Sequence, residues 1–138
     1  MINKTLAIIK PESVKNGQTG EILDLIIKAG FRISALKMYH LTVDQAKLFY
    51  AVHTNKPFFD ALVTYMSSGP VIITLLDKEN AVEDFRKLIG NTDPSLADEG
   101  TIRKKYGTDN TRNAIHGSDS DLNAETECSW FFSKFSIF

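Results

Sequence analysis

The chain has 138 residues, of which 43% are hydrophobic and 24% charged, and its net charge of −1 argues against bulk attraction to nucleic acid or an anionic membrane. Its length predicts a single domain, residues 1–138, that buries roughly two thirds of the surface its unfolded form exposes. No apolar run approaches the roughly 18 residues needed to span a bilayer, Cys128 is the only cysteine, and the first ten residues lack the long apolar core of a signal peptide, so we expect a cytoplasmic protein.

The first elements alternate between strand and helix. Residues 4–10 predict a buried strand, followed by a break at residues 11–20. A helix follows and ends at Gly30. Its apolar face consists of Ile22, Leu25, Ile26 and Ala29. Residues 31–41 then have the length and partial alternation of a second strand.

A second helical region follows this strand. Thr42 and Gln45 predict a capping box that begins a helix carrying Phe49 and Tyr50. A tight bend is expected at residues 55–57. The next helical face consists of Phe59, Leu62, Val63 and Met66.

The third strand is predicted at residues 71–76, after the helix end at residues 68–70, and it is apolar enough to be central in a sheet. A further helix has the apolar stripe Val82, Phe85 and Ile89. Residues 90–112 form a long polar connection with at most a short helix near Arg103, and loops of this length are usually functional or disordered.

The last elements are a short strand bearing His116 and a helix over residues 120–132. The resulting order predicts a βαββαβ core with insertions, in which right-handed crossovers build a four-stranded antiparallel sheet with helices on one face. This is a ferredoxin-like α/β sandwich. The tail is unusually apolar, and we expect it to pack onto the domain or against another subunit. Its apolar residues are Trp130, Phe131, Phe132, Phe135, Ile137 and Phe138.

His116 is the strongest chemical candidate. A histidine with a pKa of roughly 6.5 is mostly neutral near pH 7, so one ring nitrogen can act as a nucleophile without an activating base. Gly117 allows close approach of the backbone, and Ser118 to Ser120 are candidate helix caps. On the following helix Glu127 shares a face with apolar residues and has no Lys or Arg three or four positions away, so it is expected to hold a nearby polar group.

Other polar residues carry weaker signals. A single histidine near an apolar segment is more often structural than catalytic, and we assign no role to His40 or His53. Arg86, Arg103 and Arg112 precede His116 and suit bidentate phosphate contact, although three such arginines would more often be ordinary surface residues.

Five segments resemble the nucleoside diphosphate kinase family in order and spacing, across nearly the whole chain. They are TLAIIKP at 5–11, KPFF at 56–59, SGPV at 68–71, GTIR at 100–103 and NAIHGSD at 113–119. The resemblance implies the ferredoxin-like fold. It also implies ping-pong transfer of the γ-phosphate of a nucleoside triphosphate such as ATP, through a phosphohistidine at His116, to nucleoside diphosphates with varied bases and sugars.

The same resemblance implies a role for each matching residue. Ser118 and Glu127 would orient the imidazole, and Tyr50 would hydrogen-bond near the transferred group. The residues implied to hold the nucleotide are Lys10 and Asn113 at sugar hydroxyl and phosphate oxygens, Arg86 and Arg103 between phosphates, Thr92 at the inner phosphate, and Phe58 stacked on the base. Taken singly, each of these could be an ordinary surface or core residue; their joint spacing favours the site.

The family also implies Mg²⁺ carried on the nucleotide phosphates without an assigned protein ligand, and a homo-oligomer, either a tetramer or a hexamer. Two segments depart from its pattern. Asn110 stands where an apolar residue usually lies opposite the base, followed by Thr111 where glycine is common. Residues 103–106 read Arg-Lys-Lys-Tyr instead of Arg-Gly-Asp-Phe, which makes inference of assembly from that loop unsafe.

Two other functions compete with this one. A nucleotide-binding or regulatory homologue without turnover is disfavoured by the intact matches at Lys10, Arg86, Arg103 and His116. An RNA-binding module, which a ferredoxin-like sheet could form, is disfavoured by the charge of −1 and by the lack of a basic, aromatic-rich strand.

Overall fold

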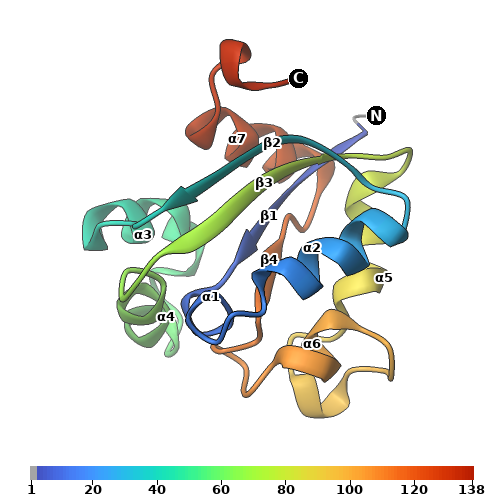
Figure 1. Cartoon of the computed structure of the whole chain (residues 1–138). Helices are drawn as coiled ribbons and strands as arrows, with labels where there is room; N and C mark the ends of the chain where they lie inside the picture. Colours follow the sequence, from blue (N-terminus) through green and yellow to red (C-terminus); the bar gives the residue numbers. More distant parts are fainter. Residues whose placement is uncertain (1–2) are drawn as a thin grey trace.

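The computed structural model describes residues 3–138 and builds them around a four-stranded antiparallel sheet in the order β2-β3-β1-β4 (Figure 1). Its strands are β1 (Lys4–Ile9), β2 (Arg32–Tyr39), β3 (Val71–Asp77) and β4 (Ile115–Gly117). β3 lies inside the sheet, as its apolar sequence predicted. β1, the first strand of the chain, lies between β3 and the last strand, β4, and pairs with both.

Across residues 3–138, α-helices and short 3-10 turns connect these strands. The helices are α1 (Pro11–Lys15), α2 (Thr19–Lys28), α3 (Val43–Phe49), α4 (Phe59–Met66), α5 (Ala81–Ile89), α6 (Ile102–Tyr106) and α7 (Asp121–Phe131). The 3-10 turns are η1 (Ala51–His53), η2 (Pro94–Leu96) and η3 (Lys134–Ser136). The predicted Thr42–Gln45 capping box begins α3, and Ser120 caps α7. The break expected after β1 instead contains α1, because Pro11 occupies the first helical turn, where no N–H is needed.

The expectation that helices cover one face of the sheet is wrong, because they cover both (Figure 1). Leu6 and Ile8 of β1 join a core with α3, α4 and α7, whereas Ala7 and Ile9 join a core with α2, α5 and α6. Successive side chains of a strand point to opposite faces, so a strand that is apolar at every position needs cover on both sides.

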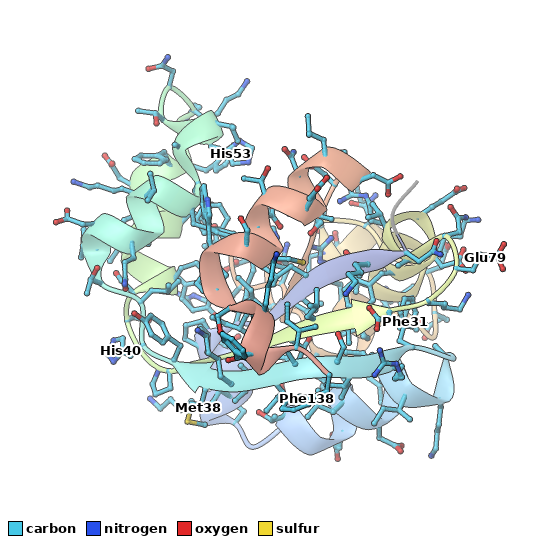
Figure 2. All side chains as sticks on the ribbon, turned by 90° about the horizontal axis from the view of Figure 1, so that it is seen from above. Phe31, Met38, His40, His53, Glu79 and Phe138 are labelled. Carbon is cyan, nitrogen blue, oxygen red and sulfur yellow. The ribbon has the colours of Figure 1, made fainter. Side chains whose placement is uncertain are left out.

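The C-terminal tail runs back along the free edge of β2, so the prediction that it packs onto the domain is confirmed for its last residues. The Phe138 N–H donates to the Ser34 carbonyl at 2.8 Å, and Arg32 Nη1 donates to the Phe138 carbonyl at 2.9 Å. Met38 and Phe138 both lie along β2 in Figure 2. Ile137 packs on the core, but the Phe135 side chain is 96% exposed, so the tail leaves apolar surface uncovered. Among the described residues, no helix combines the length and apolarity needed to cross a bilayer.

Candidate active site

His116 lies on β4, directly opposite Ile8 of β1. Residues paired in this way point to the same face of a sheet, so the imidazole faces the core formed by α3, α4 and α7. Gly117 points to the other face, where a Cβ atom would lie 2.8 Å from a ring carbon of Phe85. The close approach predicted at Gly117 is therefore confirmed, and it lets α5 pack directly behind the histidine.

The imidazole is held from α7. Glu127 Oε1 lies 3.0 Å from His116 Nε2 and accepts a 2.8 Å hydrogen bond from Ser118 Oγ, which itself accepts from the Leu6 N–H at 3.2 Å. A carboxylate can only accept, so Nε2 carries the proton and Nδ1 keeps its lone pair. The expectation that Glu127 holds a nearby polar group is confirmed, and Nδ1 is the ring nitrogen left free of this hydrogen bond.

Two aromatic side chains from α3 flank the histidine. The Phe49 ring meets the imidazole edge to face, with centroids 5.1 Å apart, and the Tyr50 ring lies 6.1 Å away. The buried Tyr50 hydroxyl has no hydrogen-bond partner among the described residues. Burial, and next the charge of Glu127, raise the pKa of Tyr50, so it stays a neutral donor. Phe49 was predicted only as a residue of this helix, without a role in the site; its position beside Tyr50 was the available signal.

A strained turn delivers the chain into β4. Ala114 has φ of +75°, and the Ile115 N–H donates to the Asn113 carbonyl at 2.9 Å, which is the hydrogen bond of a γ-turn. Such a conformation costs of order 1–3 kcal/mol outside glycine and persists only where the surroundings enforce it. Here the Lys10 N–H contributes by donating to the Ala114 carbonyl at 2.8 Å. The turn separates Asn113 from His116 and aims both into the site.

Asn113 and Lys10 hold the adjoining loops. Asn113 Nδ2 donates to the carbonyls of Thr92 at 3.0 Å and Asn110 at 3.1 Å, while its buried Oδ1 has no partner among residues 3–138. Lys10 Nζ donates to the Thr111 carbonyl at 3.2 Å. Both side chains are buried. The Lys10 ammonium has three N–H donors and Asn113 Oδ1 is unpartnered, so each side chain can still form a hydrogen bond to a ligand.

The site brings the buried side chains of Lys10 and Arg103 close enough for their positive charges to interact. Burial, and next the charge of Arg103, lower the pKa of Lys10 to about 7. Burial, and next the charge of Arg86, lower the pKa of Arg103 to about 10. The charge of Asp109 raises the pKa of Lys10, but it does not outweigh burial and the charge of Arg103, so the cluster keeps an excess of positive charge that suits an anion. Within residues 3–138, no three His, Cys, Asp or Glu side chains are grouped to hold a metal ion.

Arg103 is anchored next to the histidine. Its Nη1 donates to the Gly90 carbonyl at 3.0 Å and its Nη2 to the Ile115 carbonyl at 2.9 Å, while the buried Nε has no partner among the described residues. Arg86 is exposed and lines a cavity of about 440 Å³ together with Thr92. The predicted cationic residues and Thr92 therefore converge on the loops around β4.

Phe58 lies at the outer end of the site. Its side chain is 45% exposed just before α4, and its ring is 5.3 Å from that of His53, which in turn stacks 6.5 Å from Tyr50. His53, to which the sequence analysis gave no role, thus joins two predicted site residues; its i+3 spacing from Tyr50 was the available signal. His40 lies on the surface, with Nε2 2.9 Å from the Ser67 carbonyl.

A comparison with protein families matches residues 3–137 to the nucleoside diphosphate kinase model. The chain belongs to the nucleoside diphosphate kinase family. It is an enzyme of the transferase class, a kinase that binds nucleotides.

Individual relatives agree with this assignment. Nucleoside diphosphate kinases of Flavobacterium psychrophilum and Chlorobaculum tepidum are each 52% identical to the chain, over 130 and 131 residues; the matches cover 94% and 95% of this chain and 94% of each relative. The crystal structure of the Aquifex aeolicus nucleoside diphosphate kinase superposes with a TM-score of 0.97 at 43% identity, over 100% of both chains. The Halobacterium salinarum enzyme, solved in complex with CDP, gives 0.94 at 34% identity, over 100% of this chain and 92% of that one.

The loop that departs from the usual nucleoside diphosphate kinase pattern is well ordered by its own side chains. Asp109 Oδ1 accepts from the N–H groups of Thr111 at 3.0 Å and Arg112 at 2.7 Å. Asn110 is exposed, and only its carbonyl is tied inward, to Asn113. An exposed amide side chain is therefore presented at the position where the family usually has an apolar residue.

Proposed function

We propose that His116 carries the phosphoryl group in a ping-pong transfer between nucleotides. Its Nδ1 forms a bond to the γ-phosphorus of ATP or another nucleoside triphosphate as the bond to the bridging oxygen breaks, and the nucleoside diphosphate leaves. The β-phosphate oxygen of a second diphosphate then attacks the phosphohistidine and frees His116. The single observation that carries this proposal is the hydrogen bond that His116 Nε2 donates to Glu127 Oε1, which leaves the lone pair on Nδ1.

The cationic residues would stabilise the transferred group. Phosphoryl transfer depends mainly on positioning and on neutralising the phosphate oxygens. We assign Arg86 and Arg103 to the bridging of phosphates, Lys10 to phosphate and sugar hydroxyl oxygens, and Thr92 to the inner phosphate. The unpartnered hydroxyl of Tyr50 is suited to donate to the moving group.

Asn113 and Phe58 would hold the nucleoside. Asn113 Oδ1 lacks a partner among the described residues and is suited to accept from a sugar hydroxyl. The exposed Phe58 ring would stack on the base. Because every base has a π-face, stacking without readout of base edges explains tolerance of purines and pyrimidines.

A divalent ion, normally Mg²⁺, would arrive on the nucleotide phosphates and neutralise part of their charge. The side chains assigned to the phosphates and the sugar are Lys10, Arg86, Arg103 and Asn113, none of which is a carboxylate. Among the residues described, no three His, Cys, Asp or Glu side chains are grouped to hold a metal ion, so the site suits a metal held by phosphate and water. We assign it no protein ligand. We also assign residues 1–138 to one domain, because β1 and β4, from opposite ends of the chain, pair in one sheet. We assign the domain to the cytoplasm, since its only cysteine, Cys128, allows no intrachain disulfide.

We further propose a homo-oligomer, a tetramer or hexamer. The supporting observation is apolar surface along β2, the edge strand, where Leu36 is 48% and Met38 62% exposed beside the tail. Exposed apolar patches of this kind usually mark contacts between proteins. Light scattering would distinguish the two assemblies, and a monomer at micromolar concentration would contradict both.

Incubation with γ-labelled ATP tests the mechanism. Label should become attached to the protein, be stable in alkali and labile in acid, and be removed by GDP or dCDP. His116→Ala should abolish it, whereas His40→Ala, a change on the surface away from the site, should not. A labelled His116→Ala protein would contradict the proposal, and nucleotide binding without labelling of the wild type would favour the homologue that lacks turnover.

A further inference from the structure

A groove of about 520 Å³ runs between α4 and the loop that precedes β4. It is lined by Asp60, Ala61, Thr64 and Tyr65 from the helix, by Ser68 just after it, and by Asp109, Thr111 and Arg112 from the loop. Phe58, assigned above to the base, is the residue immediately before α4. The helix that forms one wall of the groove therefore also carries the stacking ring at its start.

The opposite wall is tied to the residues proposed to hold the nucleoside. Lys10 Nζ donates to the carbonyl of Thr111, and Asn113 Nδ2 donates to the carbonyl of Asn110. Any displacement of the loop would thus move the hydrogen-bond partners of both side chains. The separation of the two walls decides whether the base and the sugar can be held at the same time.

Glu12 connects the two walls. On one side its N–H donates to the Tyr65 hydroxyl on α4 at 2.9 Å, and on the other its Oε2 accepts from the Thr108 hydroxyl at the start of the loop at 2.7 Å. Glu12 is partly buried on the short helix α1, which follows Lys10 directly, and neither Glu12 nor Thr108 lines the groove. One residue therefore bridges elements that are 53 and 96 positions away in the sequence.

We propose that Glu12 is a positioning residue that sets the spacing between α4 and the loop, and so governs binding of the base and sugar of the nucleotide. The proposal rests on the function proposed above, in which Phe58, at the start of α4, stacks on the base and Asn113, bonded to the loop, meets the sugar. Glu12 makes no hydrogen bond to His116, Arg103 or Glu127. It should therefore act on nucleoside binding and leave the phosphate subsite and the transfer step unchanged.

Thr108→Val provides the cleanest test, because it keeps the side-chain volume and removes only the hydroxyl that reaches Glu12. Calorimetric titration should show the Kd of ADP rising about three- to ten-fold, the range expected for loss of one hydrogen bond. The Kd of pyrophosphate, which has no base or sugar, should stay unchanged, as should labelling of His116 at saturating ATP. Thr126→Val is the matched control, because Thr126 also has an exposed hydroxyl that donates one hydrogen bond, in its case to the Leu122 carbonyl on α7.

Variants at Glu12 distinguish positioning from general damage. Glu12→Gln keeps an acceptor oxygen at the same reach and should bind ADP within about two-fold of the wild type. Glu12→Ala should match Thr108→Val, and the double variant should show no further loss, because both changes remove the same hydrogen bond. Unchanged ADP affinity in Thr108→Val, or an equal loss for ADP and pyrophosphate, would overturn the inference. An unlabelled wild type would instead contradict the proposed function, and the affinity comparison would still report on Glu12.

Discussion

Replacing Lys10 with methionine should make the protein more stable at neutral pH while destroying its nucleotide affinity. The Lys10 side chain is only 5% exposed, and its ammonium lies within reach of the charge of Arg103. Methionine has a similar length and no charge, so it removes the cost of burying the ammonium. It also removes the hydrogen bond to the Thr111 carbonyl and a cation from the proposed phosphate site.

The magnitude follows from the pKa of Lys10, which burial and Arg103 lower from 10.5 to about 7. Between these values the unfolded chain holds a proton that the folded chain has released, so the free energy of unfolding rises with pH across this window. The cost of burying the charged ammonium therefore acts in full below pH 7 and disappears by about pH 10.5. The difference between the two pKa values corresponds to about 5 kcal/mol in the free energy of unfolding. Loss of the hydrogen bond to Thr111 offsets part of this, so we expect Lys10→Met to raise the free energy of unfolding by about 2–3 kcal/mol at pH 7.

Urea denaturation at pH 7 and pH 9.5, followed by circular dichroism at one protein concentration, measures this gain. The advantage of Lys10→Met should shrink by at least half at the higher pH. The raised pKa values of Tyr50 and Cys128 also influence stability in alkali, but they are common to both proteins and cancel in the difference. Lys15→Met, a change at an exposed lysine, is the control and should alter stability by less than about 0.5 kcal/mol.

Two results would refute this reasoning. If Lys10→Met is less stable than the wild type at pH 7, the buried ammonium is not a net cost. If its advantage is the same at both pH values, the proton on Lys10 does not differ between the folded and unfolded chains. Calorimetric titration with ADP completes the test, because a variant that gains stability and keeps full affinity would remove Lys10 from the site.

Three further changes test other parts of the structure. Glu127→Gln can donate to Nε2 and favour the wrong tautomer of His116, so single-turnover labelling by γ-labelled ATP should slow about 100-fold, and an unchanged rate would contradict the orienting role. Asn110→Val restores an apolar side chain opposite the base and should tighten ADP binding about three-fold in calorimetric titration; weaker binding would show that the amide contacts the nucleotide. Deleting residues 133–138 should lower the free energy of unfolding by about 1–2 kcal/mol or reduce the assembly seen by sedimentation, and an unaltered protein would contradict the packing role of the tail.

Local features of the fold were predictable because the interactions that form them lie close together in the chain. The capping box of α3 spans four residues, and the Ser120 cap of α7 reaches only to Asn123. The central place of β3 followed from its largely apolar sequence, which is interrupted before Asp77 only by Thr74. The candidate nucleophile could also be predicted from neighbouring residues, because the run around His116 combines a strand, a glycine and a helix start within a few residues.

The number of layers was not predictable in this way. A strand that is apolar at every position is buried, but the covering of each face depends on where distant helices pack. Residues 6–9 of β1 are such a run, and only the tertiary structure showed that α7 covers one face and α2 the other. The short helix α1 was missed for a related reason, since five residues with a proline at the start carry no helical periodicity.

The sequence alone determined which residues could carry chemistry: a neutral histidine, a carboxylate on an apolar helix face, and basic residues along the loops. Only the tertiary structure decided how they meet, because the decisive contacts join distant segments. The hydrogen bond of Lys10 to Thr111 spans 101 positions, and the two contacts of Glu12 span 53 and 96. Sheet pairing creates this proximity, since β1 must lie beside β4 before Lys10 can reach the loop in front of His116.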